Sequence, residues 1–224
     1  MTLSPLGDSA VVAALGTGLD DLALPRVRAL VEALGRDLPV GVVDVVPAFA
    51  SVTLFYEPAR IGSYAQLCAA IEVLAARADA SVLTFESRMV EIPVCYGGEL
   101  GSDLTVVAAQ RGLTEARVVE LHSGAHYLVH AVGFAPGFAY LGGLPEKIHT
   151  PRRATPRTSV PAGSVGIGGE QTGVYPLTTP GGWNLIGRTP LRLFDVTRAE
   201  PALLRFGDQV KFRAIGAEEF AAWK

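Results

Sequence analysis

The chain has 224 residues, of which 49% are hydrophobic and 18% are charged, and its formal net charge at pH 7 is −3. This length fits one large domain or two small ones, and the apolar content is ample for a packed core and too high for a disordered chain. Nucleic-acid-binding domains are usually basic, so the acidic balance argues against that class.

The sequence also indicates the compartment. Its start has no basic segment followed by an apolar run, so we expect no secretory signal, and no stretch approaches the ~18 apolar residues of a membrane span. The two cysteines, Cys68 and Cys95, have neither metal-binding spacing nor a disulfide framework, which is typical of reduced core residues. We therefore expect a cytoplasmic protein.

Residues 1–86 predict an α+β domain that serves as scaffold or interface. The predicted elements are a strand at 9–15, a helix at 22–34, strands at 40–46 and 51–56 joined as a hairpin, and a helix at 64–78. This β-α-β-β-α order resembles most of a ferredoxin-like split βαβ unit. Residues 79–88 are the predicted boundary.

Residues 87–224 predict a second domain built mainly of strands. Two short helices are expected at 104–111 and 115–122, each preceded by residues of the capping type, Ser102-Asp103 and Thr114. The predicted strands are 90–96, 127–134, 164–167, 183–187, 191–194 and 209–212. Many short strands at close spacing predict a compact β-barrel or sandwich with a few helices.

Residues 134–190 contain 8 of the 15 prolines and 11 of the 25 glycines of the chain. Both residue types fix special backbone geometry, so this density predicts many defined turns. Between them stand aromatic residues and arginines, and residues 147–194 hold six basic side chains against one acid, Glu170. This local positive charge suits a small anion, although a solvated basic face is the alternative. We predict the functional site here.

Three arginines of this segment, Arg152, Arg157 and Arg188, are the candidates for binding an anion, whereas Arg153 is equally suited to a solvated position. The chain contains neither a phosphate-binding loop nor a glycine-rich dinucleotide-binding turn. If it binds a nucleotide, arginine side chains and backbone amides must therefore hold the phosphates.

Two aromatic residues beside glycines and prolines, Tyr140 and Trp183, are candidates to stack on a substrate or to close the barrel core. Gln171, Thr172 and Asn184 offer neutral hydrogen bonds to an amide, or they satisfy backbone groups in turns. The sequence leaves both alternatives open for each group.

Residues 163–166 approach the nucleophile elbow of serine hydrolases, but the serine stands one place early. The strand–turn–helix context of that motif is also missing, since Gly168 and Gly169 follow. Such a glycine-rich stretch lets the backbone approach a ligand closely, or it turns a corner of a barrel.

Three histidines, His122, His126 and His130, recur at every fourth residue. The second half of this stretch is strand-like, which would place His126 and His130 on one face. No carboxylate or cysteine completes a ligand set nearby, so we predict packed or hydrogen-bonded histidines and no metal site.

Taken together, these motifs resemble the family of 5-oxoprolinase B subunits, and the resemblance extends over most of the chain. Related members are named allophanate hydrolase subunit 1, carboxyltransferase regions of urea carboxylase, and a KipI-type inhibitor of a sporulation histidine kinase. The matching strings are Gly7-Asp8-Ser9-Ala10, Ile92-Pro93-Val94, Tyr96-Gly97-Gly98, His122-Ser123, Gly133-Phe134, Pro136-Gly137-Phe138, Tyr140-Leu141, Leu144-Pro145, Pro151-Arg152, Pro156-Arg157, Val160-Pro161-Ala162-Gly163-Ser164-Val165, Gln171-Thr172-Gly173, Tyr175-Pro176, Pro180-Gly181-Gly182-Trp183, Ile186-Gly187-Arg188-Thr189 and Gly207-Asp208.

The resemblance implies a ferredoxin-like domain over residues 1–86 and a cyclophilin-like β-barrel domain over residues 87–224 that carries the active site. It implies the B component of an ATP-dependent 5-oxoprolinase, inactive alone, that helps its partner C and A subunits open 5-oxo-L-proline to L-glutamate. ATP, with magnesium, would be held by this chain or mainly by its partner, and Glu170 or a partner residue would hold the magnesium. The alternatives are a component acting on allophanate or another urea derivative, and a KipI-like inhibitor of a sensor histidine kinase.

The resemblance also divides the expected site residues into two groups. The expected catalytic residues are Arg152, Arg157 and Arg188. The expected substrate-binding residues are Phe134, Pro136, Tyr140, Ser164, Gln171, Thr172, Trp183 and Asn184.

Overall fold

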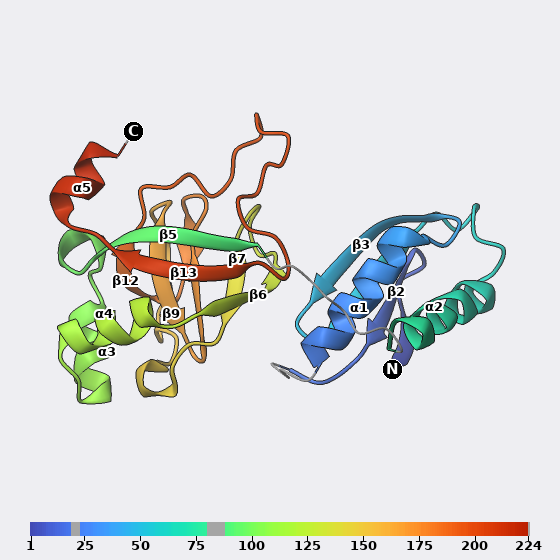
Figure 1. Ribbon diagram of the computed structural model, residues 1–224, viewed down its shortest axis with the longest axis horizontal. Coiled ribbons are helices and arrows are strands. Elements are labelled where there is room, and N and C mark those ends of the chain that lie inside the picture. Colours follow the sequence, from blue (N-terminus) through green and yellow to red (C-terminus); the bar gives the residue numbers. More distant parts are fainter. Residues whose placement is uncertain (19–22, 80–87, 224) are drawn as a thin grey trace. The chain divides into compact units, whose positions relative to one another are not determined.

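The structure is a computed structural model in which residues 1–18, 23–79 and 88–223 are described. The chain divides into two compact units, Met1–Glu86 and Ser87–Lys224 (Figure 1). Most of the predicted boundary, residues 80–87, lies outside the described part, as does Leu22 at the start of the first predicted helix. Among the described residues, no helix has both the length and the apolar character needed to cross a membrane.

The N-terminal unit is a four-stranded antiparallel sheet with two helices. Its elements are β1 (Thr2–Leu6), β2 (Ala10–Ala14), α1 (Ala23–Arg36), β3 (Val42–Ala48), β4 (Ser51–Tyr56) and α2 (Tyr64–Asp79). The strands follow the order β1-β2-β4-β3. Helix α1 buries Val27, Leu30 and Leu34, whose spacing is that of an apolar stripe, and it packs against α2, β3 and β4.

Strand β1 was not predicted, because its residues are mostly exposed and include Pro5. The proline is tolerated because β1 is an edge strand, held by its antiparallel pairing with β2. Among the described residues β1 occupies the sheet edge next to β2, where a ferredoxin-like domain would place a strand that follows α2. The ferredoxin-like assignment therefore stays a prediction, although the predicted α+β order of β2 to α2 is confirmed.

The C-terminal unit contains a closed seven-stranded barrel (Figure 1). Around the barrel the order is β6-β13-β5-β12-β9-β10-β7, and β6 pairs with β7 to close it; only β13 and β5 run parallel. The barrel strands are β5 (Met89–Tyr96), β6 (Tyr127–Val132), β7 (Ala139–Gly142), β9 (Ser164–Gly168), β10 (Gln171–Val174), β12 (Asn184–Arg188) and β13 (Gln209–Ala214). A separate ribbon pairs β8 (Arg157–Val160) with β11 (Thr179–Gly181). The helices of this unit are η1 (Gly98–Leu100), α3 (Leu104–Arg111), α4 (Glu115–Gly124), η2 (Glu146–Ile148) and α5 (Ala217–Ala222).

The barrel interior is a packed core rather than a channel. Tyr127 and Phe212 are almost fully buried there, together with side chains from α3 and α4. His122, on α4, lies in this core with its ring 4.5 Å from that of Phe212. Its two ring nitrogens hydrogen-bond the hydroxyls of Tyr96 (2.7 Å) and Thr172 (2.9 Å), and burial lowers the pKa of His122 to about 3. The imidazole is therefore a neutral structural group.

The compact barrel predicted for this unit is confirmed, whereas the more specific cyclophilin-like assignment stays a prediction. Residues 191–194 were predicted as a strand, which is wrong, because among them Phe194 forms only an isolated bridge with Ala202. Strands β7, β8, β10 and β11 were missed, because each is only three or four residues long and becomes a strand only through its partner.

Of the two predicted helix caps, one makes a side-chain capping hydrogen bond and the other does not. Thr114 caps α4, since its side-chain oxygen accepts a hydrogen bond from the backbone N–H of Arg117. Asp103 precedes α3 but its carboxylate makes no capping hydrogen bond. It is turned instead toward the barrel, and that orientation defines part of the site.

Candidate functional site

A cavity of about 320 Å³, here the aromatic cavity, opens on the barrel beside the start of β12. Its walls are mostly aromatic rings and prolines, with two arginines. The lining residues are Phe134, Phe138, Tyr140, Arg152, Arg153, Pro156, Tyr175, Pro180, Gly181, Gly182 and Trp183. This volume and composition suit a small ring, because small-molecule sites are largely apolar with few polar groups.

The loop between β6 and β7 shapes one wall of the aromatic cavity. It is closed by backbone hydrogen bonds from the N–H of Gly133 to the carbonyl of Phe138 (3.0 Å) and from the N–H of Phe138 to the carbonyl of Ala135 (3.0 Å). Phe134 has φ +71°, a conformation that costs a bulky residue about 1–3 kcal/mol and that concentrates at functional sites. Phe134 is 63% exposed at the cavity rim, whereas Phe138 is only 2% exposed.

Phe138 is the centre of the aromatic cluster. Its ring makes edge-to-face contacts with four neighbours, a geometry that adds about 0.5–1.5 kcal/mol per pair beyond the buried area. The ring centroids lie 4.9 Å away for Tyr140, 5.3 Å for Tyr175, 5.5 Å for Phe134 and 5.5 Å for Trp183. The walls of the cavity are therefore fixed in place by one another.

Glycines behind the cluster leave room for these rings. A Cβ atom on Gly168 would lie 2.5 Å from the indole nitrogen of Trp183, and one on Gly173 would lie 2.8 Å from the carbonyl oxygen of Ala139. The sequence left two alternatives for the glycines of β9, close approach of a ligand or a barrel corner. The structure shows a different role, since Gly168 leaves room for the ring of Trp183.

We expect Gly168→Ala to lower the free energy of unfolding by about 1–3 kcal/mol, because the indole of Trp183 must move out of its seat. Urea titration monitored by tryptophan fluorescence would measure this. Gly35→Ala, at a helical position with open space around it, is the control and should be neutral or stabilising. Equal effects of both substitutions would contradict this account.

Arg152 provides positive charge at the aromatic cavity. Its guanidinium carbon lies 5.9 Å from the centroid of the Trp183 ring, and among the described residues no carboxylate pairs with it. Burial raises the pKa of the Tyr175 hydroxyl, while a hydrogen bond with the backbone of Trp183 and the charge of Arg152 oppose that shift. The cavity thus combines aromatic walls with a guanidinium that pairs with no carboxylate in the described part of the chain, which favours a small ring bearing a negative charge.

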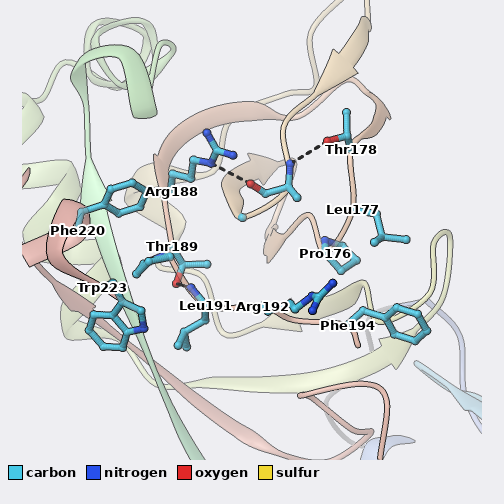
Figure 2. A pocket seen from close by; sticks show the side chains of 13 residues that line it. Pro176, Leu177, Thr178, Arg188, Thr189, Leu191, Arg192, Phe194, Phe220 and Trp223 are labelled. Carbon is cyan, nitrogen blue, oxygen red and sulfur yellow. Dashed lines mark hydrogen bonds between the residues drawn. The ribbon is translucent and has the colours of Figure 1, made fainter. Parts of the chain in front are cut away.

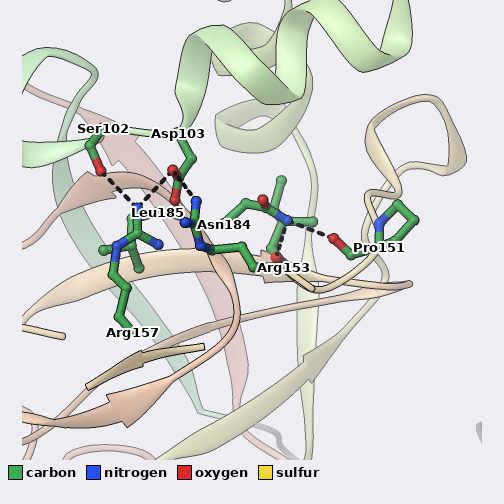
Figure 3. A network of polar contacts seen from close by, with 8 residues as sticks. Ser102, Asp103, Pro151, Arg153, Arg157, Asn184 and Leu185 are labelled. Atoms are coloured by element: carbon green, nitrogen blue, oxygen red, sulfur yellow. Dashed lines mark hydrogen bonds and ion pairs between the residues drawn. The ribbon is translucent and has the colours of Figure 1, made fainter. Parts of the chain in front are cut away.

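Asp103 joins two arginines and a barrel strand behind the cavity (Figure 3). One carboxylate oxygen of Asp103 accepts hydrogen bonds from Arg157 (2.7 Å) and Arg153 (3.1 Å), and the other accepts one from the backbone N–H of Leu185 (2.7 Å). The Asp103 side chain is only 5% exposed. This network anchors the segment that carries Arg152 to the start of α3.

Arg157, a predicted catalytic residue, is therefore part of the Asp103 network. It also donates to the Ser102 hydroxyl at 3.3 Å, and its Nη1 is buried without a hydrogen-bond partner among the residues that the structure describes. Arg153, which the sequence suited equally to a solvated position, shares the same carboxylate. The sequence did not reveal the role of Asp103, because a Ser-Asp pair before a helix is typical of a cap.

Arg188 lines a second, larger cavity of about 670 Å³, here the Arg188 cavity (Figure 2). Its Nε donates to the carbonyl of Ala162 at 2.8 Å. The other lining residues are Ala162, Gly163, Pro176, Leu177, Thr178, Thr189, Pro190, Leu191, Arg192, Phe194, Phe220 and Trp223. The three predicted arginines thus stand in three settings, with Arg152 at the aromatic cavity, Arg157 on Asp103 and Arg188 in this cavity.

The polar residues predicted to contact substrate are mostly committed to the protein itself. Thr172 is fully buried between His122 and the carbonyl of Gly166, and Asn184 donates to the carbonyl of Pro151 at 2.8 Å. Ser164 is buried in β9, and Gln171 is buried in β10 with its Nε2 lacking a partner. Asn184 also lines a polar cavity of about 540 Å³ beside Arg152 and Arg153.

Pro136 and Glu170 are exposed and line none of these three cavities, so the structure brings neither into the described sites. Phe138 and Tyr175 are the members of the aromatic cluster that were not predicted. Their signal was present in the sequence, since Phe138 follows Gly137 and Tyr175 precedes Pro176, just as Trp183 follows a glycine.

The histidines do not act together. His126 is exposed and His130 is buried, because β6 bulges between Val129 and Ala131, so the prediction that they share a face is wrong. The described residues contain no group of three or more His, Cys, Asp or Glu side chains that could hold a metal ion.

Comparison with known proteins shows which proteins are similar to this chain in sequence and in fold. Residues 1–204 match the family model described as carboxyltransferase domain, subdomain C and D. The chain is 51% identical to the 5-oxoprolinase B subunit of Escherichia coli O157:H7, over 92% of this chain and 93% of that protein. The solved structure of TTHA0988 has a TM-score of 0.81 and 39% identity, over 93% of this chain and 40% of that one. The K. lactis urea amidolyase, with a TM-score of 0.76 and 20% identity over 98% of this chain and 15% of that one, shares the fold.

Proposed function

Because the chain belongs to the carboxyltransferase-domain family of subdomains C and D, within the group of 5-oxoprolinase B subunits, we propose that it helps open 5-oxo-L-proline to L-glutamate with ATP. In this proposal it acts with partner C and A subunits and is inactive alone. Its two units are the ferredoxin-like and cyclophilin-like domains that the family resemblance implies.

The aromatic cavity is the observation that carries this proposal. 5-Oxo-L-proline is a five-membered ring with one carboxylate, and the cavity offers about 320 Å³ between Phe134, Tyr140 and Trp183. Arg152 stands over Trp183 without a carboxylate partner among the described residues, so its guanidinium is available to the substrate carboxylate. We assign substrate contact to these four residues.

The chemistry explains the need for partners. Amide resonance makes unaided hydrolysis of the lactam slow. Transfer of a phosphoryl group from bound ATP to the amide oxygen, which leaves ADP, would break this resonance. Among the described residues that line the aromatic cavity, none is a serine, cysteine, histidine, aspartate or glutamate. This chain therefore orients the ring and neutralises its charge, which are the main tasks in phosphoryl transfer, and the C and A subunits supply the remaining groups.

The direct test is formation of ADP and glutamate from ATP and 5-oxo-L-proline, with this chain alone and then mixed with its C and A partners. We expect turnover only in the mixture. A verified, assembled complex without turnover would contradict the substrate assignment. The same complex would then be assayed with allophanate, because the urea amidolyase of Lachancea kluyveri is 24% identical over 98% of this chain, and the chain alone would be assayed for inhibition of a histidine kinase.

We expect Arg152→Ala to raise the KM of the assembled complex for 5-oxo-L-proline by about tenfold, because a hydrogen-bonded contact to a charged group is lost. The kcat should fall less, since the contact is present in both ground and transition states. Arg117→Ala, which removes an arginine paired with Glu120 on the exposed surface, is the control. An unchanged KM in Arg152→Ala would remove Arg152 from the substrate site.

A further inference from the structure

We propose that the Arg188 cavity binds a nucleoside triphosphate, with the phosphates at Arg188 and Arg192 and the base against the aromatic side chains of Phe220 and Trp223. The inference rests on the proposed function only for the identity of the nucleotide, ATP. At about 670 Å³ the cavity lies within the range of small-molecule sites, which is roughly 300–1,000 Å³.

The charge of the cavity favours an anion. Two of its lining residues are arginines and, among the described residues, none of those that line it is acidic. Arg192 is paired with Asp195 at 3.1 Å, but Arg188 has no carboxylate partner among the described residues. The Nε of Arg188 is held by the carbonyl of Ala162, which fixes the guanidinium and leaves its terminal nitrogens for a ligand.

Aromatic side chains favour a ligand that carries a ring as well as a charge. Phe220 belongs to α5 and Trp223 follows it, and Figure 2 shows both on the same side of the cavity as Arg188. Trp223 is 39% exposed, so part of the residue is accessible to a ligand. Stacking of a base on an aromatic side chain is worth about 1–3 kcal/mol and tolerates any base.

The position of the cavity relates it to the proposed substrate site. Tyr175 lines the aromatic cavity and the next residue, Pro176, lines the Arg188 cavity. A Cβ atom on Gly137, which precedes Phe138 in the wall of the aromatic cavity, would lie 3.0 Å from the Cβ of Phe194, which lines the Arg188 cavity. The two cavities are therefore lined by residues that adjoin in the chain and in space within one unit, which fits the placement of a phosphoryl donor near its acceptor.

The test is binding of a non-hydrolysable ATP analogue, measured by calorimetry on the full chain and on the assembled complex. We expect binding that Arg188→Ala weakens by roughly 10–100-fold, because a charge-assisted contact to phosphate is lost. Arg192→Glu gives a second variant that does not endanger folding, since the Arg192 side chain is 71% exposed, and it should weaken binding about tenfold. Arg117→Ala is again the control, since it removes one surface charge elsewhere.

Tryptophan fluorescence tests the base contact, since the chain has two tryptophans. The analogue should quench emission in the wild type and in Trp183→Phe, but not in Trp223→Phe. Binding of inorganic triphosphate as tight as that of the analogue would overturn the nucleotide assignment. Absence of binding in both chain and complex, or full affinity in Arg188→Ala and Arg192→Glu, would overturn the site. Neither result depends on turnover, so the proposed function is tested separately.

Discussion

Asp103→Ala is expected to lower the free energy of unfolding by about 3 kcal/mol. The substitution leaves the buried N–H of Leu185 without an acceptor and removes the carboxylate that pairs Arg153 and Arg157. The arginines keep part of their solvation, because their side chains are 36% and 23% exposed, so the loss stays below that of a fully buried pair. Chemical denaturation at pH 7 would measure it.

Glu120→Ala is the matched control for Asp103→Ala. It removes a carboxylate of an exposed ion pair with Arg117, and such pairs contribute about 0–1 kcal/mol. Because the Asp103 network anchors the segment that carries Arg152, the Asp103 variant should also raise the KM for the substrate in the assembled complex. A loss of stability no larger than that of Glu120→Ala would show that Asp103 is not a structural centre.

The second large effect is a loss of stability at acid pH caused by His122. Its pKa falls from an ordinary 6.5 to about 3 in the folded protein, so below pH 6.5 the unfolded chain binds a proton that the folded chain does not. Stability therefore falls as the pH is lowered from 6.5 toward 3, by about 1.4 kcal/mol per pH unit. At pH 5 the contribution is roughly 2 kcal/mol, and over the whole interval it approaches about 5 kcal/mol.

Comparison with His122→Gln isolates this contribution, because the other titrating groups are common to both proteins. At pH 7 the variant should be the less stable protein, since Tyr96 and Thr172 lose the geometry of their hydrogen bonds to the ring. The difference should shrink by roughly 2 kcal/mol between pH 6.5 and pH 5. A difference that stays constant with pH would mean that the imidazole takes up protons in the folded state.

Several parts of the site were visible in the sequence, and others were hidden for identifiable reasons. Tyr140, Trp183, Phe134 and Arg152 were selected because aromatic and arginine residues between glycines and prolines indicate presented side chains, and they do line one cavity. The pattern could not separate Arg152, which lies over the ring of Trp183, from Arg157, which pairs with the carboxylate of Asp103.

The glycines of β9 and β10 show the same limit. For residues 163–169 the sequence suggested close approach of a ligand or a barrel corner, whereas Gly168 in fact leaves room for the ring of Trp183, as Gly173 does for the ring of Phe138. Similarly, Thr172 looked available to an amide, but His122, fifty residues earlier, occupies its hydroxyl. Each error arose where the deciding partner was distant in the chain.

The sequence by itself determined the α+β order of the first unit, the barrel of the second and the family, and it selected the segment that lines the aromatic cavity. These depend on local periodicity, on turn residues and on strings of neighbouring residues, all of which can be read along the chain. Only the tertiary structure decided which arginines line a cavity, which one pairs with a buried carboxylate, and that the consecutive residues Tyr175 and Pro176 line two different cavities. The reason is physical: burial and pairing of a charge depend on groups brought together by barrel closure, such as Asp103 and Leu185, 82 residues apart.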